Sequence, residues 1–466
     1  MSKHQELIDR LNATGQTQMA QHLSSSEESI AARLAEQLNQ LNLDELAGLA
    51  QGGSEEETPR DYSKLSPPPA FRLQDQADSI KTQQACEVGE QLMRDGKVAA
   101  LLVAGGQGSR LGFDHPKGMF PIGPVSNKTL FQIHFEKIVA RGKRYGKSIP
   151  LYLMTSPATH DETIAFLTEH KNFGIAEDDL HVFCQGTMPA IDKDTKQLLL
   201  AEPDQLALSP DGHGGMLAAL VKSGCLRNMK ARGIEQIYYF QVDNPLADVC
   251  EPEFLGLHEM SDSEMSTQVV AKQKPEEKLG ILAELDGKLQ LVEYSELPPE
   301  YAAQRSEDGS LKYWAGNIAV HGITVSFLDR MATQAGSLPW HKAIKKVPFV
   351  SPAGEAISPE EPNAIKFERF IFDLLPQAQK PLVLEVDPAL CFAPVKNAEG
   401  APSDTPEAAK QALCGMYRSW LRKCGIDCDD SRNVEIGPLI ALDAGELENK
   451  LKQNPQLAEA DLIDMS

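Results

Sequence analysis

The sequence predicts an α/β protein, with a mostly parallel sheet and crossover helices between a helical N-terminal region and a small C-terminal unit. Short apolar runs alternate with helix-like segments from about residue 97 to 385, the pattern of strand–helix–strand units. Apolar residues recur at three- and four-residue spacings over residues 4–50, which indicates helices. The chain has 466 residues, too many for one small core, so two or three domains are expected.

Residues 1–95 are expected to form the N-terminal helical region and a linker. The helical periodicity lies in "QELIDRLNATGQTQMAQHL" and "IAARLAEQLNQLNLDELAGLA". The following "QGGSEEETPRDYSKLSPPPA" has the glycine, proline and charged composition of a linker.

Residues 96–400 are expected to hold the sheet, and residues 401–466 a small C-terminal domain. The predicted strands are "VAALLVA", "IPLYLMTS", "LHVFCQ", "QIYYFQVD", "STQVVAKQ" and "NIAVHGI". The C-terminal unit should contain a helix near "PEAAKQALCGMYRSWLRKC" and then a polar, helical-looking tail.

Composition excludes several classes of partner. The net charge of −22 argues against nucleic acid or an anionic membrane as the main partner. No apolar run approaches the roughly 18 residues of a membrane span, and the first residues lack the apolar core of a secretory signal. The eight cysteines are scattered without zinc-ribbon spacing, so reduced thiols and a cytoplasmic location are expected. Composition leaves the oligomeric state open.

The most informative segment is "AGGQGSRLGFDHPKG", residues 104–118, directly after a predicted buried strand. Glycines permit positive φ, so successive N–H groups can point into one concavity and bind phosphate, aided by the N-terminus of the following helix. The spacing G-x-G-x-x-x-G is not the dinucleotide fingerprint, which disfavours a nicotinamide dehydrogenase. The order Lys117–Gly118 is not that of a Walker loop.

This loop resembles the signature L-x-x-G-G-x-G-[ST]-R-L-G-x-x-x-P-K-G of nucleotide-sugar pyrophosphorylases. More specifically, the chain resembles the eukaryotic-type UDP-N-acetylhexosamine pyrophosphorylases, which are UTP-dependent sugar-1-phosphate uridylyltransferases. The resemblance covers nearly the whole chain and includes "SPDGHGG", "QVDNPL", "LVEYSEL", "AGNIAVH", "IKFERFIFDLLP" and "FAPVKNAEG". It implies a Rossmann-like nucleotidyltransferase fold, a mixed sheet flanked by helices.

The resemblance also implies the reaction, in which UTP and a sugar 1-phosphate give a UDP-sugar and pyrophosphate. The sugar phosphate oxygen attacks the α-phosphorus in line, so the protein mainly positions the substrates and neutralises charge. Arg110 and Lys117 would hold the β- and γ-phosphates, and Lys396 would reach the reaction centre. The residues that would let the backbone approach the nucleotide are Gly105, Gly106 and Gly108. Pro116 should help to fix the direction of Lys117.

Asp243 ends the apolar strand "IYYFQVD", and ligands bind at the carboxyl ends of strands in open α/β sheets. A single carboxylate there, completed by substrate phosphates and water, suits Mg²⁺, the expected cofactor. By resemblance, Gln185 would hydrogen-bond the uracil edge and Gly212 would lie against the base. Glu293 and Asn317 match positions that hold sugar hydroxyls.

The identity of the sugar remains open because of His213. The acetylhexosamine branch usually reads G-N-G-G here and the UDP-glucose branch G-H-G followed by an acid, whereas this chain reads "GHGG". N-acetylglucosamine 1-phosphate is the expected substrate, with His213 in the sugar site. The alternatives are a UDP-glucose or broad UDP-sugar pyrophosphorylase, or a non-catalytic nucleotide-sugar-binding scaffold. Tyr313 and Trp314, which stand just before Asn317 in the sequence, could line the sugar pocket or simply pack in the interior.

Overall fold

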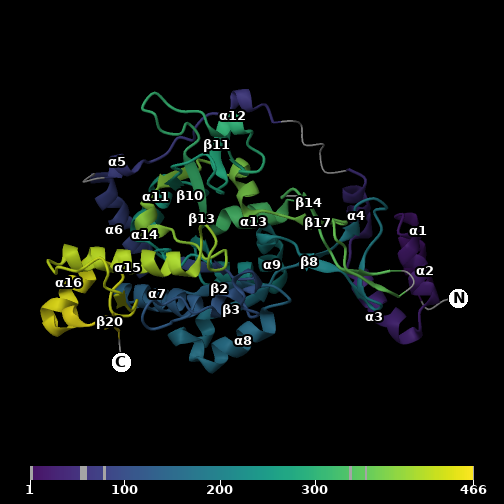
Figure 1. The fold of residues 1–466 in the computed structure, drawn as a ribbon, viewed down its shortest axis with the longest axis horizontal. Coiled ribbons are helices and arrows are strands. Elements are labelled where there is room, and N and C mark those ends of the chain that lie inside the picture. Colours follow the sequence, from purple (N-terminus) through teal and green to yellow (C-terminus); the bar gives the residue numbers. More distant parts are fainter. Residues whose placement is uncertain (1–3, 53–59, 77–79, 335–337, 352–353, 465–466) are drawn as a thin grey trace. The chain divides into compact units, whose positions relative to one another are not determined.

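The computed structural model describes residues 4–52, 60–76, 80–334, 338–351 and 354–464. The chain folds into two compact units (Figure 1), of which the first combines residues 1–61, 185–216 and 336–373 and the second contains the rest. The predicted linker falls partly on residues 53–59, which lie outside the described residues. No helix in the described ranges is long and apolar enough to cross a bilayer.

The first unit packs four N-terminal helices onto small sheets. These helices confirm the predicted periodicity and are α1 (Gln5–Ala13), α2 (Thr17–Ser25), α3 (Glu28–Asn39) and α4 (Leu43–Ala50). Their apolar faces form one core with Ile191, Leu198, Leu200, Leu206, Ile365 and Phe367. The strands form a β14–β17–β5 sheet, a β16–β15–β6–β7 sheet and a β4–β8 pair. Their bounds are β4 (Thr187–Pro189), β5 (Ile191–Asp192), β6 (Leu200–Glu202), β7 (Gln205–Leu206), β8 (Leu208–Pro210), β14 (His341–Lys345), β15 (Phe349–Val350), β16 (Ala356–Ile357) and β17 (Ala364–Glu368).

The second unit is built on a nine-stranded sheet with the path β12–β11–β13–β9–β1–β2–β3, to which β10 is added beside β13 and β18 beside β10. The bounds are β1 (Val98–Val103), β2 (Leu151–Thr155), β3 (Leu180–Cys184), β9 (Gln236–Gln241), β10 (Met265–Ala271), β11 (Ile281–Leu285), β12 (Lys288–Val292), β13 (Ala315–Thr324) and β18 (Leu382–Glu385). Strands β9, β1, β2 and β3 are parallel, whereas β13 runs antiparallel to β9. The predicted mixed sheet is confirmed, and all six predicted strands lie in it.

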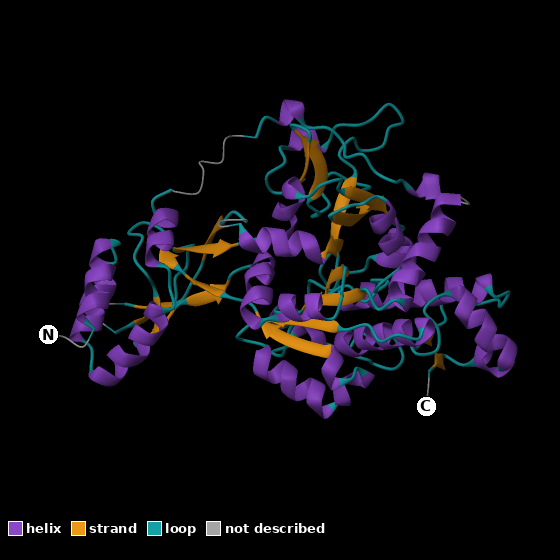
Figure 2. Ribbon diagram, turned by 180° about the vertical axis from the view of Figure 1, so that it is seen from behind, coloured by secondary structure: helices purple, strands orange, loops and turns teal. Residues whose placement is uncertain are grey.

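Helices surround this sheet (Figure 2). They are α5 (Leu73–Gln76), α6 (Ile80–Arg94), α7 (Leu130–Tyr145), α8 (His160–Glu169), α9 (Met216–Ser223), α10 (Cys225–Ala231), α11 (Pro252–Met260), α12 (Pro299–Ala302), α13 (Val325–Thr333), α14 (Pro388–Cys391), α15 (Pro406–Lys423) and α16 (Ala444–Gln453). Residues of α6, α7 and α11 form one buried cluster with Val98, Ala100 and Leu102 of β1.

The compact units follow a different division from the one predicted at residues 95 and 400. The C-terminal helices α15 and α16 share the core of the sheet unit, because Leu413, Tyr417 and Leu447 are buried in the same cluster as β1. The N-terminal helices do not form a region of their own, since their apolar faces need the strands of residues 185–216 and 336–373 to complete a core.

Candidate functional site

The glycine loop starts where β1 ends and closes on itself through backbone hydrogen bonds. Lys117 N donates to Gly106 O at 3.0 Å, and Gly108 N donates to His115 O at 2.9 Å. The hydroxyl of Ser156, just after β2, donates to Gly105 O at 2.7 Å. The loop therefore has a defined backbone shape that neighbouring strands support.

Two roles were predicted for the glycines, a positive φ and close approach of a ligand to the backbone, and the structure differs from the prediction in the first. Within this described loop only Gly112 has a positive φ, of 69°, so Gly105, Gly106 and Gly108 are not used for left-handed backbone. A Cβ at Gly106 would meet nothing within 4 Å, whereas one at Gly108 would lie 2.7 Å from Phe113 O. Gly108 thus permits tight packing, and Gly106 leaves bare, exposed backbone that a ligand could approach.

The two cations of the loop are presented differently. Arg110 is exposed, and among the described residues no carboxylate lies within ion-pair distance of it. Lys117 follows Pro116, whose φ of −51° sets the chain direction as expected. A Cβ at Gly118 would lie 2.2 Å from the Phe131 ring of α7, so the segment after Lys117 is seated directly on that helix.

Two of the first N–H groups of helix α7 are already bonded within the protein. The Thr129 side chain accepts from Gln132 N, and Leu130 N donates to Phe120 O at 3.0 Å. Helix α7 instead supports the two loops that carry the candidate residues Lys117 and Asp243.

Asp243 lies beside Lys117. It follows β9, which is parallel to β1, and Val242 N extends that pairing by donating to Val103 O at 3.1 Å. Lys117 Nζ lies 3.5 Å from Asp243 Oδ2, and the two side chains are only 17% and 14% exposed. The lysine predicted to bind phosphate and the aspartate predicted to bind the metal thus form one partly buried ion pair.

Three buried polar residues of α7 hold the turn that carries Asp243, and none of them was predicted from the sequence. His134 Nε2 donates to Val242 O at 3.0 Å. Lys137 Nζ donates to Pro245 O and Ala247 O at 2.7 and 2.8 Å, and Arg141 bonds Val249 O and the Asp248 carboxylate. Their spacing of three and four residues places them on one face of the helix. The sequence pattern that could have indicated them is this row of polar residues in a helix whose other periodic positions are apolar.

We expect Lys137→Met to destabilise the protein by about 1–3 kcal/mol, because two buried carbonyl groups lose their donor. Burial lowers the pKa of Lys137 from 10.5 to about 8. The folded protein then releases this proton near pH 8, whereas the unfolded chain keeps it to higher pH. The unfolding free energy of the wild type should therefore rise relative to the variant between pH 8 and 10.5. Denaturant titrations of wild type and Lys137→Met at several pH values in this range measure the difference in unfolding free energy.

Lys143→Met is the matched control, since Lys143 lies on the same helix and is exposed. A parallel pH dependence for wild type and Lys137→Met would contradict the assignment of a shifted, buried ammonium.

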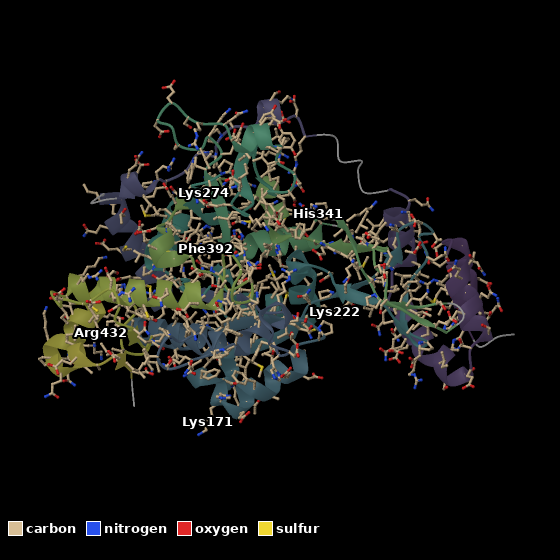
Figure 3. The ribbon with its side chains drawn as sticks, viewed as in Figure 1. Lys171, Lys222, Lys274, His341, Phe392 and Arg432 are labelled. Atoms are coloured by element: carbon tan, nitrogen blue, oxygen red, sulfur yellow. The ribbon has the colours of Figure 1, made fainter. Side chains whose placement is uncertain are left out.

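Lys396 reaches this region through backbone links to the Asp243 turn. Val395 N donates to Asp243 O at 2.8 Å, and Asn244 bonds Cys391 O and Ala393 N through its amide. The Lys396 ammonium lies 6.0 Å from the centre of the Phe392 ring, which Figure 3 labels. Lys117 and Lys396 are 279 positions apart, and the structure ties their two loops to the same turn.

A second carboxylate, Asp404, is also part of this region and was not predicted. Its carbonyl accepts from Lys396 N and Asn397 N at 2.8 and 3.0 Å. Burial raises the pKa of Asp404, the charge of Lys396 lowers it, and the charge of Asp243 raises it, so the three groups interact electrostatically. Asp404 is the last residue of the segment "AEGAPSD", in which no local pattern marks it as a site residue.

The sugar-site candidates Glu293 and Asn317 lie at the same end of the sheet as Asp243. Val292, Ile281 and Gly316 lie side by side across β12, β11 and β13, and the candidates each come one residue later. Strand β13 is antiparallel to β9 with His321 opposite Tyr239, so Asn317 lies toward the carboxyl end of β9.

The backbone around Asn317 is irregular. The pairing of β10 with β13 shifts between Gln268 and Val269, and Ala319 has a φ of +57°. Asn317 Oδ1 accepts from Ala319 N at 3.1 Å and so supports this bulge. Bulges of this kind re-aim side chains, and strained backbone is concentrated at functional sites.

The two aromatic residues before Asn317 pack. The hydroxyl of Tyr313 donates to Leu65 O at 2.9 Å, and its side chain is buried. The Arg72 guanidinium lies 3.7 Å from the centre of the Trp314 ring. Tyr313 is therefore a packing residue, whereas Trp314 packs on Arg72 and also lines a hollow with Ser306 and Lys312.

Gln185, Gly212 and His213 belong to the first unit. Gly212 has a φ of +82°, and a Cβ there would lie 2.4 Å from Arg369 O. The segment after β17 holds this glycine turn, since Arg369 N donates to Asp211 O and Gly214 N donates to Arg369 O, each at 2.8 Å. Gly212 is therefore required by both its conformation and its close neighbour.

His213 is a neutral, packed imidazole. Its Nδ1 accepts from Ile371 N at 3.1 Å, and its ring lies against Phe370 and Phe372. Burial and the nearby His341 lower the pKa of His213 to about 4. With Nδ1 used as an acceptor, the proton is on Nε2, and the ring has only a single donor left for a ligand.

The C-terminal segment closes over the loop that follows Lys117–Gly118. Val125 N, Ser126 N and the Ser126 hydroxyl all donate to Glu435, at 2.8, 2.8 and 2.6 Å. The buried Lys128 ammonium donates to Glu136 and Asp464 at 2.6 and 2.7 Å. Burial opposes the charge, but hydrogen bonds to Asp464 and Glu136 outweigh it and raise the pKa of Lys128.

Comparisons with known proteins agree with this arrangement. Residues 49–466 match the model of the family described as UTP–glucose-1-phosphate uridylyltransferase. The chain is 39% identical to human UDP-N-acetylhexosamine pyrophosphorylase-like protein 1, over 74% of this chain and 69% of that protein. It is 37% identical to UDP-N-acetylglucosamine pyrophosphorylase of Saccharomyces cerevisiae, over 80% of each chain. The crystal structure of the Trypanosoma brucei UDP-N-acetylglucosamine pyrophosphorylase with an inhibitor superposes with a TM-score of 0.85 at 26% identity, covering 100% of this chain and 98% of that one.

Proposed function

Because the chain belongs to the UTP–glucose-1-phosphate uridylyltransferase family, we propose that it transfers the uridylyl group of UTP to N-acetylglucosamine 1-phosphate. It is a nucleotidyltransferase, and its relatives at 33–39% identity carry the acetylated sugar in their names. The observation that carries the proposal is the Lys117–Asp243 pair at 3.5 Å, where the glycine loop after β1 meets the end of β9.

In the proposed reaction the sugar phosphate oxygen attacks the α-phosphorus of UTP as the bond to the β-phosphate oxygen breaks. Arg110 and Lys117 would hold the β- and γ-phosphates and stabilise the negative charge that pyrophosphate carries away. Lys396 would neutralise charge at the α-phosphorus. The bare backbone at Gly106, with Gly105 and Gly108 beside it, would allow the close approach of the triphosphate.

Mg²⁺ is the proposed cofactor, and Asp243 its proposed ligand. The described residues contain no cluster of three histidine, cysteine or acidic side chains that could hold a metal alone. Asp243, with Asp404 within electrostatic reach, fits an ion that takes its remaining oxygens from phosphates and water. When bound, such an ion would supply positive charge that offsets the negative charge of the substrate phosphates.

The remaining candidates would recognise the base and the sugar. Gln185 and Gly212 are proposed for uracil, and Glu293, Asn317 and the Nε2–H of His213 for sugar hydroxyls. The polar, irregular backbone at Asn317 and the fixed tautomer of His213 support these roles. We also propose that the enzyme works in the cytoplasm.

Pyrophosphate release in the presence of UTP, Mg²⁺ and a panel of sugar 1-phosphates tests the function. Release should be fastest with N-acetylglucosamine 1-phosphate. Absence of release with every sugar phosphate, despite binding of a UDP-sugar, would support the scaffold alternative instead.

A second candidate acceptor is glucose 1-phosphate, and the observation in its favour is His213 in the place of the usual asparagine. We expect wild type to prefer the acetylated sugar by about 10–200-fold, the range that a pocket contact to one small group provides. His213→Asn should change this preference, because a flexible amide with both a donor and an acceptor replaces one fixed donor. The measurement is kcat/KM for both sugar phosphates at fixed UTP.

His341→Asn is the matched control. His341, which Figure 3 labels, also packs on Phe370, but its Nε2 is held by the Asp373 carboxylate at 2.8 Å. If wild type prefers glucose 1-phosphate and His213→Asn moves the preference toward the acetylated sugar, His213 sets the specificity and the proposed acceptor is wrong.

A further inference from the structure

The carboxylate of Asp211 is enclosed beside Gln185. Strands β4 and β8 pair with Thr187 opposite Pro210, so Gln185–Gly186 and Asp211–Gly212 lie at the same end of this two-stranded ribbon. Asp211 N donates to Gly186 O at 3.1 Å and continues the pairing. Asp211 is only 6% exposed and Gln185 only 8%, so the two side chains meet away from bulk water.

Two glycines leave the space that this carboxylate fills. A Cβ at Gly186 would lie 2.6 Å from Asp211 Oδ2, and a Cβ at Gly215 would lie 2.1 Å from Oδ1. Oδ1 is buried without a hydrogen-bond partner. An aspartate that is packed this closely has one fixed orientation. Burying a carboxylate oxygen without a hydrogen bond costs stability, which indicates that the carboxylate has a function at this position.

The partners of Asp211 define its chemistry. The Gln185 side chain acts as a hydrogen-bond donor to the carboxylate. Burial raises the pKa of Asp211 to about 6, and the Arg369 charge and the Gln185 bond oppose this rise. Asp211 is therefore mainly ionised above pH 7. Two contacts fix Arg369 itself. Its guanidinium carbon lies 3.7 Å from the centre of the Trp340 ring, and its Nη2 lies 3.2 Å from Oε1 of Glu45 in α4.

We propose that Asp211 is a positioning residue that fixes the orientation of the Gln185 amide and thereby makes the protein select uracil over cytosine. The inference rests on the proposed function, in which Gln185 contacts the base. An ionised carboxylate only accepts hydrogen bonds, so the NH₂ group of Gln185 must face Asp211. The amide oxygen and the second N–H then remain for the base.

This orientation matches uracil and opposes cytosine. Uracil presents an N3–H donor next to a carbonyl acceptor, which pair with the amide oxygen and the second N–H. Cytosine presents an N3 acceptor next to an amino donor, the reverse pattern. Binding cytosine would require the amide to turn over, which would place its oxygen against the Asp211 carboxylate.

The test compares kcat/KM for UTP and CTP with the same sugar 1-phosphate, in wild type, Asp211→Asn and Ser209→Ala. Asn can accept or donate toward Gln185, so both amide orientations become available. The UTP-to-CTP ratio should fall by about tenfold or more in Asp211→Asn, the cost of one unsatisfied buried polar group. Ser209→Ala removes a buried hydroxyl two positions away on β8 and should leave the ratio unchanged.

A double-mutant cycle separates positioning from a general structural effect. If Asp211 acts through Gln185, Asp211→Asn should not alter the ratio further in a Gln185→Ala background. Thermal melting checks that each variant is folded, and Asp211→Ser replaces Asp211→Asn if the latter is not. An unchanged UTP-to-CTP ratio in a folded Asp211 variant, or an additive effect in the cycle, overturns the inference. Failure of the proposed function is distinct, because wild type would then turn over neither nucleotide.

Discussion

Lys117→Ala is expected to lower kcat about 10²–10³-fold, the usual cost of removing one positioned electrostatic contact to a developing charge. The fold should survive, because the loop is closed by the backbone bond from Lys117 N to Gly106 O, which alanine keeps. The loss should exceed any change in KM for UTP, since the charge on pyrophosphate grows as the bond breaks. Initial rates of pyrophosphate release over a range of UTP concentrations measure both constants.

Lys230→Ala is the control for this variant. Lys230 forms an ion pair with Asp329 at 2.5 Å, but both side chains are exposed, at 51% and 43%. This substitution should leave kcat within about twofold of wild type, in keeping with the small worth of surface pairs. A Lys117→Ala enzyme with near-normal kcat and UTP affinity would refute the assignment of Lys117.

Asp243→Asn is expected to raise the Mg²⁺ concentration for half-maximal activity at least about tenfold, because the amide keeps the size of the carboxylate and removes its charge. The variant also takes away the partner of Lys117, 3.5 Å distant, so some loss of kcat should remain at saturating Mg²⁺. Titration of Mg²⁺ at fixed substrates separates the two effects.

Asp329→Asn completes the matched pair and should give a wild-type Mg²⁺ titration. Full activity in EDTA, or a Mg²⁺ titration that is the same in Asp243→Asn and wild type, would count against the metal assignment.

Local signals account for the parts of the fold that the sequence predicted. Strand β1 is a buried apolar run followed by glycines, and Asp243 follows another such run, so both could be placed at strand ends. The first unit could not be predicted in the same way. Its core joins Leu34 of α3 to Leu200 and Phe367, and no property of the three separate segments specifies that they meet.

The candidate site shows the same limit. Its motif residues could be named because the loop resembles a known signature, but the reason for their geometry lay in residues without a motif. The donors His134, Lys137 and Arg141 read as ordinary polar positions of a helix until the turn at 242–249 is placed beside them. Gly106 was expected to let a ligand approach the backbone, and its exposed backbone has room for one, although it lacks the positive φ that glycines permit.

The closure of the C-terminal segment over the loop after Lys117 has a consequence for biosynthesis. Glu435 and Asp464, which hold Ser126 and Lys128, leave the ribosome long after the loop itself. Asp464 follows Lys128 by 336 residues, so at translation rates of about 5–20 residues per second the buried ammonium waits roughly 20–70 s for its second carboxylate. The loop that follows Lys117–Gly118 thus gains its last buried partner long after its own residues have been made, and until then the Lys128 ammonium has only Glu136 to pair with.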